Sequence, residues 1–133
     1  DPALIEPLTK EVQSITAPGE PIFVALNNNS GHYANAPTLY WLLDRPPASR
    51  YFEFNPCLTD RNDIQAVIVK DLRDTDVVVT TSFYPARPPF GVPGTVLDDY
   101  LSRHFHMKAE FPFPVKPGEF QHAYRLLVRV SEG

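Results

Sequence analysis

The sequence predicts an α/β fold in which a three-layer, mainly parallel, Rossmann-like sheet ends in a C-terminal antiparallel hairpin. Two short runs, residues 22–26 and 77–81, are apolar or β-branched throughout, a pattern typical of strands covered on both faces. Segments with a helical spacing of apolar residues alternate with these runs, which favours parallel strands joined by right-handed crossovers. The last part of the chain alternates apolar and polar residues instead, as half-exposed antiparallel strands do.

The first two predicted elements are a helix and a buried strand. Apolar residues at helical spacing predict an amphipathic helix over about residues 6–15, and Pro18-Gly19 ends it. Residues 22–26 (IFVAL) follow as a strand. We expect this strand at the centre of the sheet, adjacent or nearly adjacent to residues 77–81.

The middle of the chain is predicted to hold two helices and two strands. Pro37 can occupy the first turn of a short helix that the Arg45-Pro46-Pro47 segment stops. Residues 51–54 (YFEF) indicate a strand, and residues 63–72 indicate a helix with one apolar face. Residues 76–82 form the second buried strand.

The C-terminal part is predicted to hold a helix and a hairpin. Thr95 can cap the helix, with Asp98 and Asp99 in a first turn where carboxylates suit the helix dipole. A half-exposed strand follows, and its apolar residues are expected on one face: Met107, Ala109, Phe111 and Phe113. A type II turn at Pro117-Gly118 then leads to a strand over residues 124–130.

The composition is that of one ordinary globular domain spanning residues 1–133. Hydrophobic residues make up 43% and charged residues 21%, which argues against disorder, and a chain of this length can bury a self-sufficient core. The net charge of −4 gives no general attraction to phosphate backbones, so we expect no nucleic acid partner. The single cysteine, Cys57, excludes an internal disulfide and is predicted to be a buried, inert thiol.

The apolar runs are all far shorter than the roughly twenty residues of a membrane-spanning helix, so we expect this piece itself to be soluble and monomeric. The chain begins at Asp1 without an initiator Met or a signal peptide. This start indicates a mature chain or a domain excised from a larger membrane protein.

The residue patterns indicate no catalytic centre, no metal site and no cofactor. Asp98 and Asp99 point about 100° apart on a helix, which favours a role at the helix start over a carboxylate dyad. His104 and His106 fall on different elements without a further ligand at a recognised spacing, which favours solvated or structural roles. The segment after residue 26 lacks both the GxGxxG and the P-loop pattern.

A ligand crevice is predicted between the two loops that follow the buried strands, residues 27–33 and 82–93. Ligands of open parallel sheets collect outside the carboxyl ends of the strands. The crevice would hold two hydrogen-bonding residues, two aromatic residues as a wall and an arginine for an anionic group: Asn28, Ser30, Tyr33, Tyr84 and Arg87. The alternative is that turn chemistry alone explains the Asn-rich loop and that the prolines pack both loops closed.

Further aromatic residues and arginines are candidates for stacking on sugar rings or for holding a phosphate. They are Tyr40, Trp41, Phe83 and Phe90, and Arg45 and Arg50. Core packing of the aromatic residues and ordinary surface ion pairing of the arginines are the alternatives.

An ordered series of segments runs through the chain: PIFVAL, LYWLLDRPPASRY, DVVVTT, LDDYLSRHF and YRLLVRV. In this order the whole chain resembles the C-terminal soluble domain of polytopic bacterial glycosyltransferases that use polyprenyl-phosphate sugars, the protein-mannosyltransferase-like and arabinosyltransferase-like group. The catalytic acids of such transferases lie between early transmembrane helices, so the resemblance carries no catalytic residue to this chain.

The resemblance implies an accessory domain on the extracytoplasmic face of the bacterial cell membrane. Its partners would be the transmembrane portion of the parent protein and a polyprenyl-phosphate sugar or glycan acceptor that the domain helps to position. A free-standing periplasmic or cytosolic carbohydrate-binding module is the alternative, and a small α/β hydrolase is a third.

Overall fold

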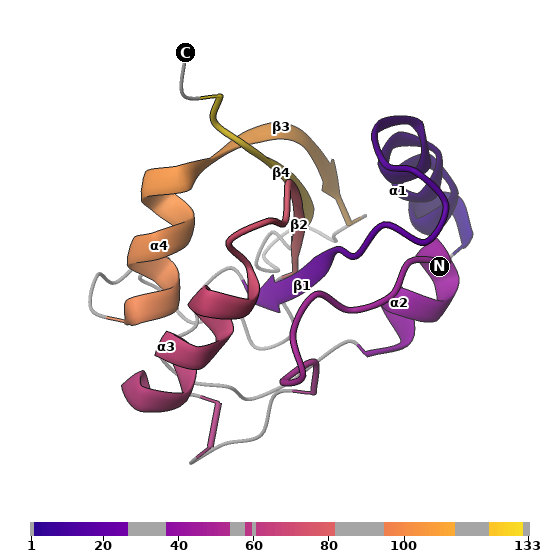
Figure 1. Ribbon diagram of the computed structural model, residues 1–133. Coiled ribbons are helices and arrows are strands. Elements are labelled where there is room, and N and C mark those ends of the chain that lie inside the picture. Colours follow the sequence, from indigo (N-terminus) through magenta and orange to yellow (C-terminus); the bar gives the residue numbers. More distant parts are fainter. Residues whose placement is uncertain are drawn as a thin grey trace.

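The computed structural model describes residues 2–26, 37–53, 58–59, 61–81, 95–113 and 123–131. Helices and strands follow one another in the order shown in Figure 1: α1 (Pro2–Ile15), β1 (Phe23–Leu26), α2 (Thr38–Leu43), α3 (Asn62–Asp71), β2 (Val77–Thr81), α4 (Val96–His104), β3 (Phe105–Pro112) and β4 (Ala123–Arg129). The fold is therefore α/β, as predicted.

The described strands form one mixed sheet in the order β1-β2-β4-β3. β1 and β2 are parallel, whereas β4 is antiparallel to both β2 and β3. The prediction of a mainly parallel sheet is thus corrected, because β4 occupies the place beside β2 that a further parallel strand would need. The predicted C-terminal antiparallel pair is present as β3 and β4.

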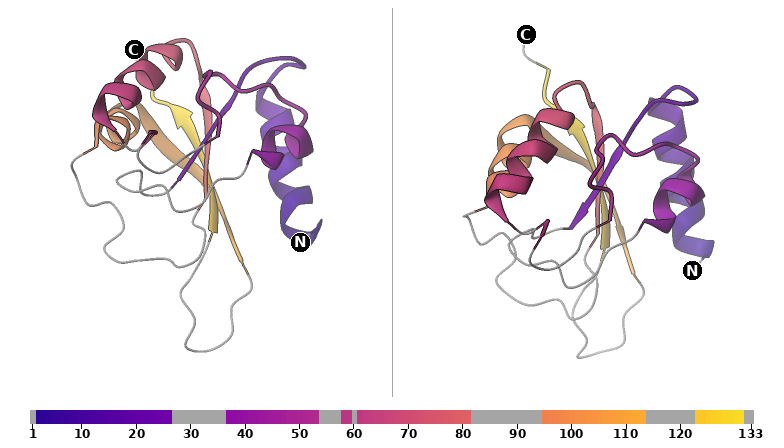
Figure 2. Two further views of the ribbon diagram at one scale, coloured as in Figure 1. Left: turned by 90° about the horizontal axis from the view of Figure 1, so that it is seen from below. Right: turned by 60° about the horizontal axis from the view of Figure 1, so that its bottom comes forward.

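Helices cover both faces of the sheet (Figure 2). α1 and α2 pack on one face in a core with Val24, Val79 and Leu126, and α3 and α4 pack on the other face in a core with Phe23 and Val78. Consecutive residues therefore contribute to opposite cores from Phe23 to Ala25 in β1 and from Val77 to Val79 in β2, whereas Leu26 joins Ala25 in the α3 and α4 core. This explains why their sequences are apolar without alternation. A Rossmann-like arrangement stays a prediction.

β1 lies at the edge of the described sheet rather than at its centre, which corrects the expected position. All of its residues are nevertheless buried. The backbone of Ile22 donates to the carbonyl of Pro46 at 3.0 Å and accepts from Ala48 at 2.8 Å. The next outward N–H, that of Val24, donates to the hydroxyl of Tyr40 at 2.9 Å. The segment around Pro46 and the Tyr40 side chain of α2 thus take the place of a neighbouring strand.

Residues 51–53 belong to no strand, although the sequence predicted one over residues 51–54, and residue 54 lies outside the described residues. The backbone N–H of Tyr51 donates to the Ser49 hydroxyl at 3.1 Å. The Phe52 ring meets the Tyr40 ring edge-on, with 6.2 Å between the centroids. Phe52 therefore packs against α2, and Tyr51 packs against the α3 and α4 core, instead of extending the sheet.

A β-bulge at Lys108 divides the apolar face that was predicted for β3. Met107 pairs with Leu127, whereas Ala109 pairs with the preceding residue of β4, Leu126. Because directly paired residues share a face, Met107 lies on the α3 and α4 side, and Ala109 lies on the α1 and α2 side. The predicted single face of Met107, Ala109, Phe111 and Phe113 is correct only for the last three.

The remaining helix predictions are confirmed with shifted ends. α1 begins at Pro2, so Pro7 lies inside the helix rather than near its start. The Thr95 hydroxyl caps α4 by accepting from the N–H of Asp98 at 3.1 Å, and Asp98 and Asp99 lie in the first turn as expected. Cys57 and the predicted turn at Pro117-Gly118 lie outside the described residues.

Candidate functional site

The carboxyl ends of β1 and β2 lie side by side. Leu26, the last residue of β1, is the register partner of Thr81, the last residue of β2. The two segments predicted to form the ligand crevice therefore start from neighbouring points of the sheet. The assigned residues Asn28, Ser30, Tyr33, Tyr84 and Arg87 all lie outside the described residues, so the crevice itself stays a prediction.

One row of paired residues crosses the whole described sheet at this end. Leu26 pairs with Thr81, Thr81 with Tyr124, and Tyr124 with Phe111. We call these four residues the terminal row. Paired residues of neighbouring strands have side chains within reach of one another. The row thus joins an aliphatic residue, two hydroxyl groups and two aromatic rings, and none of the four residues carries a charge at neutral pH.

Three residues of the terminal row, Thr81, Tyr124 and Phe111, belong to the face that α1 and α2 cover, whereas Leu26 packs in the core with α3 and α4. Val77 and Val79 of β2 lie in the core on the α1 and α2 face, and Thr81 continues the same alternation. Tyr124 lies in that core too. The preceding row of the sheet lies on the opposite face and is polar, because Arg125 there contacts Glu110 at 2.9 Å.

The hydroxyl of Thr81 has no hydrogen-bond partner among the described residues, although the residue is 0% exposed. A buried hydroxyl without a partner costs about 1–3 kcal/mol of folding free energy. Such groups are rare in native proteins and call for a specific reason. Within the described part of the chain, the Thr81 hydroxyl is the buried side-chain oxygen or nitrogen in this condition.

An aromatic pair stands beside this hydroxyl. The Phe113 ring meets the Tyr124 ring at 62°, with 4.8 Å between the centroids, and Phe111 is partly buried against the same core. Burial raises the pKa of the Tyr124 phenol above its ordinary value, so its hydroxyl stays protonated at neutral pH. The Tyr124 and Phe113 rings thus pack on each other in the core on the α1 and α2 face.

The candidate arginines with described side chains are occupied by contacts within the protein. Arg45 is buried, and its guanidinium donates to the Thr16 hydroxyl at 2.9 Å and to the carbonyls of Asp44 and Thr16 at 2.8 and 3.3 Å. Arg50 lies 3.6 Å from Asp71. Arg45 therefore serves the fold by tying α1 to the end of α2, and Arg50 forms a surface ion pair.

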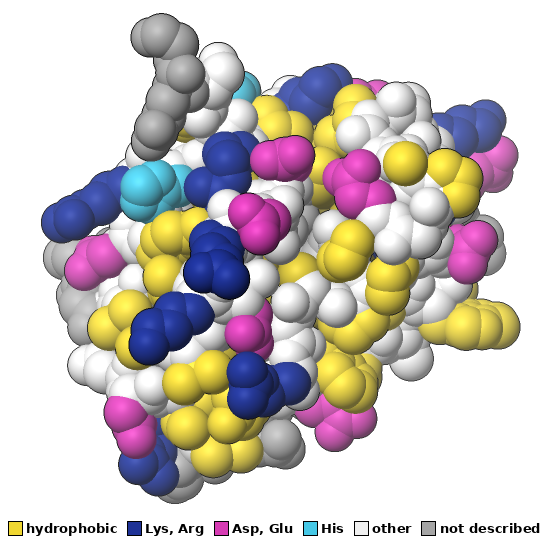
Figure 3. All heavy atoms as spheres, in the orientation of Figure 1, with side chains coloured by type: hydrophobic (Ala, Val, Ile, Leu, Met, Phe, Trp, Pro, Cys, Tyr) yellow, Lys and Arg dark blue, Asp and Glu magenta, His cyan; other side chains and the backbone are white. Residues whose placement is uncertain are grey.

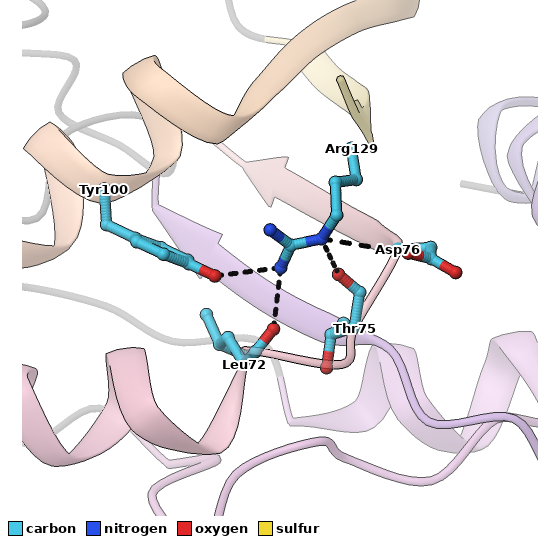
Figure 4. Close-up of polar contacts among 5 residues, drawn as sticks. All are labelled: Leu72, Thr75, Asp76, Tyr100 and Arg129. Carbon is cyan, nitrogen blue, oxygen red and sulfur yellow. Dashed lines mark hydrogen bonds and ion pairs between the residues drawn. The ribbon is translucent and has the colours of Figure 1, made fainter. Parts of the chain in front are cut away.

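Arg129 forms a polar cluster, which Figure 4 shows between α3, α4 and β4. Its guanidinium donates to the carbonyls of Leu72 and Thr75 at 2.8 and 3.0 Å and to the Tyr100 hydroxyl at 2.8 Å. Asp76 lies 3.7 Å away, and the Phe105 ring centroid lies 4.7 Å from the guanidinium carbon. The guanidinium of Arg129 is therefore engaged in contacts that hold β4 to α4 and to the segment after α3.

The start of α4 is not an anion site, because its N–H groups already have partners. Val96, Leu97 and Asp98 donate to the side chains of Asn62, Gln65 and Thr95 at 3.3, 2.9 and 3.1 Å. Over the face shown in Figure 3, Lys and Arg side chains are interspersed with Asp and Glu, and no broad region of one sign stands out.

The other candidate residues are placed as follows. Among the described residues, no group of three or more His, Cys, Asp or Glu could hold a metal ion. The His104 ring lies 4.6 Å from the Tyr100 ring. Tyr40 is in the core, whereas Trp41 is 82% exposed on α2. Phe83 and Phe90 lie outside the described residues.

Sequence reasoning missed the terminal row. Its signal was the threonine at the end of the buried run VVVTT, together with Tyr124 at the start of the last strand. The sequence alone does not connect Thr81 with Tyr124, because their pairing depends on β4 lying beside β2.

Comparisons with protein-family models, with curated proteins and with solved structures find no match for this chain. None of the helices in the described residues combines the length and the apolar character needed to cross a membrane.

Proposed function

We propose that this chain is an extracytoplasmic accessory domain of a bacterial membrane glycosyltransferase, which helps to position the acceptor or the lipid-linked sugar donor. The order of segments from PIFVAL to YRLLVRV supports the parent family. The partners in this proposal are the transmembrane portion of the parent protein and a polyprenyl-phosphate sugar or glycan acceptor.

The observation that carries the proposal is the pairing of Leu26 with Thr81 at the carboxyl ends of parallel strands. In Rossmann-like sheets this edge is where ligands bind. The described sheet is mixed, but β1 and β2 are parallel, and we propose that a ligand binds at their carboxyl ends. The terminal row supplies uncharged hydroxyl groups and aromatic rings there, which is the chemistry that a sugar requires.

A free-standing carbohydrate-binding α/β module is the second candidate function. The Phe113 and Tyr124 ring pair favours it, because this pair would serve a sugar ligand equally well without a membrane-embedded parent. The two functions share the sugar site and differ in whether a polyprenyl chain adds to binding.

Titration of the isotopically labelled chain by NMR tests both functions. The probes are a short-chain polyprenyl-phosphate hexose, the same polyprenyl phosphate without the sugar, and a neutral hexose disaccharide. We expect saturable amide shifts at Leu26, Thr81 and Tyr124, with tighter binding of the lipid-linked sugar under the first function and equal binding of both sugars under the second. Shifts confined to residues 105–110, or no shifts with any probe, would contradict both.

A further inference from the structure

β3 is an outer strand of the described sheet, and within that part of the chain it pairs with β4 alone. It is eight residues long, and His106, Met107, Lys108, Glu110 and Pro112 are exposed. The outward N–H and C=O groups of an exposed strand of this length can pair with a strand of a second molecule. An edge of this kind therefore calls for a feature that prevents self-association.

The extra residue Lys108 interrupts this edge near its middle. Met107 and Ala109 pair with consecutive residues of β4, so Lys108 between them has no register partner. The Lys108 amine bonds to Glu11 on α1, and Ala109 packs against the core on the α1 and α2 face. Two consecutive residues of β3 thus face the same side. This is the arrangement of a β-bulge, which bends the strand and breaks the two-residue repeat of its backbone groups.

We infer that the bulge at Lys108 is a conformational guard that keeps β3 from pairing with β3 of a second copy of this chain. The bulge divides the edge into residues 105–107 and 109–112, whose outward groups cannot both align with one straight strand. The guard acts through backbone shape, because the Lys108 charge is held against α1 by Glu11 instead of lying along the edge. This inference does not depend on the proposed function.

Deletion of Lys108 should remove the guard and keep the fold. Met107 and Ala109 would become neighbours and would pair with Leu127 and Leu126 in one unbroken register, each on its present face. The regular edge could then pair with the same edge of a second molecule about a two-fold axis. The weight-average mass of the deletion variant should rise toward twice that of the monomer over about micromolar to millimolar concentrations.

The substitution Lys108→Ala is the matched control. It keeps the number of residues in β3, and with it the bulge, but removes the amine and its contact with Glu11. If backbone shape is the guard, Lys108→Ala should stay monomeric at every concentration at which the wild-type chain is monomeric.

The experiment compares the wild-type chain, the Lys108 deletion and Lys108→Ala by sedimentation velocity over a concentration series. Far-UV circular dichroism checks that each protein is folded, and amide hydrogen exchange locates the surface that associates. The inference expects only the deletion variant to associate, with protection of amides in residues 105–112 that increases with protein concentration.

A folded deletion variant that stays monomeric would overturn the inference, and so would association that adds no protection in β3. Wild-type chains that already pair through β3 would show that the bulge guards nothing. Equal association of the deletion variant and Lys108→Ala would assign the effect to the charge instead of the backbone. A deletion variant that does not fold would show that the fold itself needs the extra residue, which also contradicts the role of a dispensable guard.

Discussion

The side-chain oxygen Oε1 of Gln65 accepts a hydrogen bond from the backbone N–H of Leu97 at 2.9 Å, and both residues are fully buried. The amide nitrogen of the same side chain donates to the carbonyl of Thr59 at 3.1 Å. One α3 side chain therefore fixes both the first turn of α4 and the segment before α3. The α4 helix starts where it does because Gln65 and Thr95 satisfy its first N–H groups.

Gln65→Leu should lower the free energy of unfolding by about 2–4 kcal/mol, because it leaves the buried Leu97 N–H without its acceptor. Urea unfolding followed by far-UV circular dichroism measures this change. Asn62→Ala is the matched control, since Asn62 caps the exposed Val96 N–H, which water can also satisfy. The control should stay within about 0.5 kcal/mol of the wild type. Equal effects of the two substitutions would contradict the special role of Gln65.

Tyr40→Phe should expose the edge of β1 to hydrogen exchange. The Val24 N–H then loses the hydroxyl that accepts its hydrogen bond, and the unfolding free energy should fall by about 1–2 kcal/mol. Native-state exchange should show the largest loss of protection at Val24. Ala25, whose N–H points toward β2 by the alternation of the strand, is the internal control. A uniform loss at Val24 and Ala25 would indicate global destabilisation instead.

Tyr40 should also make the protein sensitive to alkaline pH. Burial raises the pKa of its phenol above the ordinary value of 10.0, and the hydrogen bond from Val24 only partly opposes this effect. The unfolded chain therefore releases the proton first as the pH rises past about 10, and the stability due to the buried neutral phenol is lost from there upward.

The variant tests this sign directly. Above about pH 10 the unfolding free energy of the wild type should fall more steeply with pH than that of Tyr40→Phe, by up to about 1.4 kcal/mol per pH unit. Tyr124, whose pKa is also raised by burial, is present in both proteins and cancels in the comparison. Urea unfolding between pH 8 and about pH 11 measures the two slopes, and parallel slopes would refute the assignment to Tyr40.

Arg129→Lys should destabilise the protein by about 1–3 kcal/mol even though the charge is kept. A lysine cannot reproduce the planar guanidinium that bonds the Leu72 carbonyl, the Thr75 carbonyl and the Tyr100 hydroxyl together. Arg103→Lys on the exposed side of α4 is the control and should change the stability by less than about 0.5 kcal/mol. Thermal unfolding of the three proteins side by side decides between a structural and a surface role.

The chain alone should show neither glycosyl transfer nor glycoside hydrolysis. The proposed function places the catalytic acids in the transmembrane portion of the parent, and the residue patterns of the sequence indicate no acid and base pair. Incubation with polyprenyl-phosphate sugars and simple glycosides checks this. Turnover that survives purification and disappears in a single carboxylate variant would overturn the prediction.

Local elements were predictable because they depend on short stretches of sequence. Apolar residues at helical spacing indicated α1, α3 and α4, and the Thr95 cap was visible as a hydroxyl before two acids. The position of β1 was not predictable, because an apolar run shows that both faces are covered and not how many strands flank it. At its outer edge, Pro46, Ala48 and Tyr40 take the place of a strand, and nothing in residues 22–26 indicates this.

The arrangement of β3 and β4 was beyond local reasoning for a similar reason. One extra residue at Lys108 moves Met107 to the other face while leaving an apparently regular alternation. The terminal row depends on long-range pairing, since Thr81 meets Tyr124 only when β4 lies beside β2. The chemistry of the candidate site could therefore be recognised only after the strand order was known.

The strand order has a consequence for how the protein acquires its structure. β4 is the last of the described strands along the chain, yet it lies between β2 and β3 in the sheet. β2 already pairs with β1, and it gains its second neighbouring strand only when residues 123–129, which are distant in sequence, pair with it as β4. Such non-local closure slows folding, so on the ribosome the N-terminal half must wait, with one side of β2 open, until β4 has been synthesised.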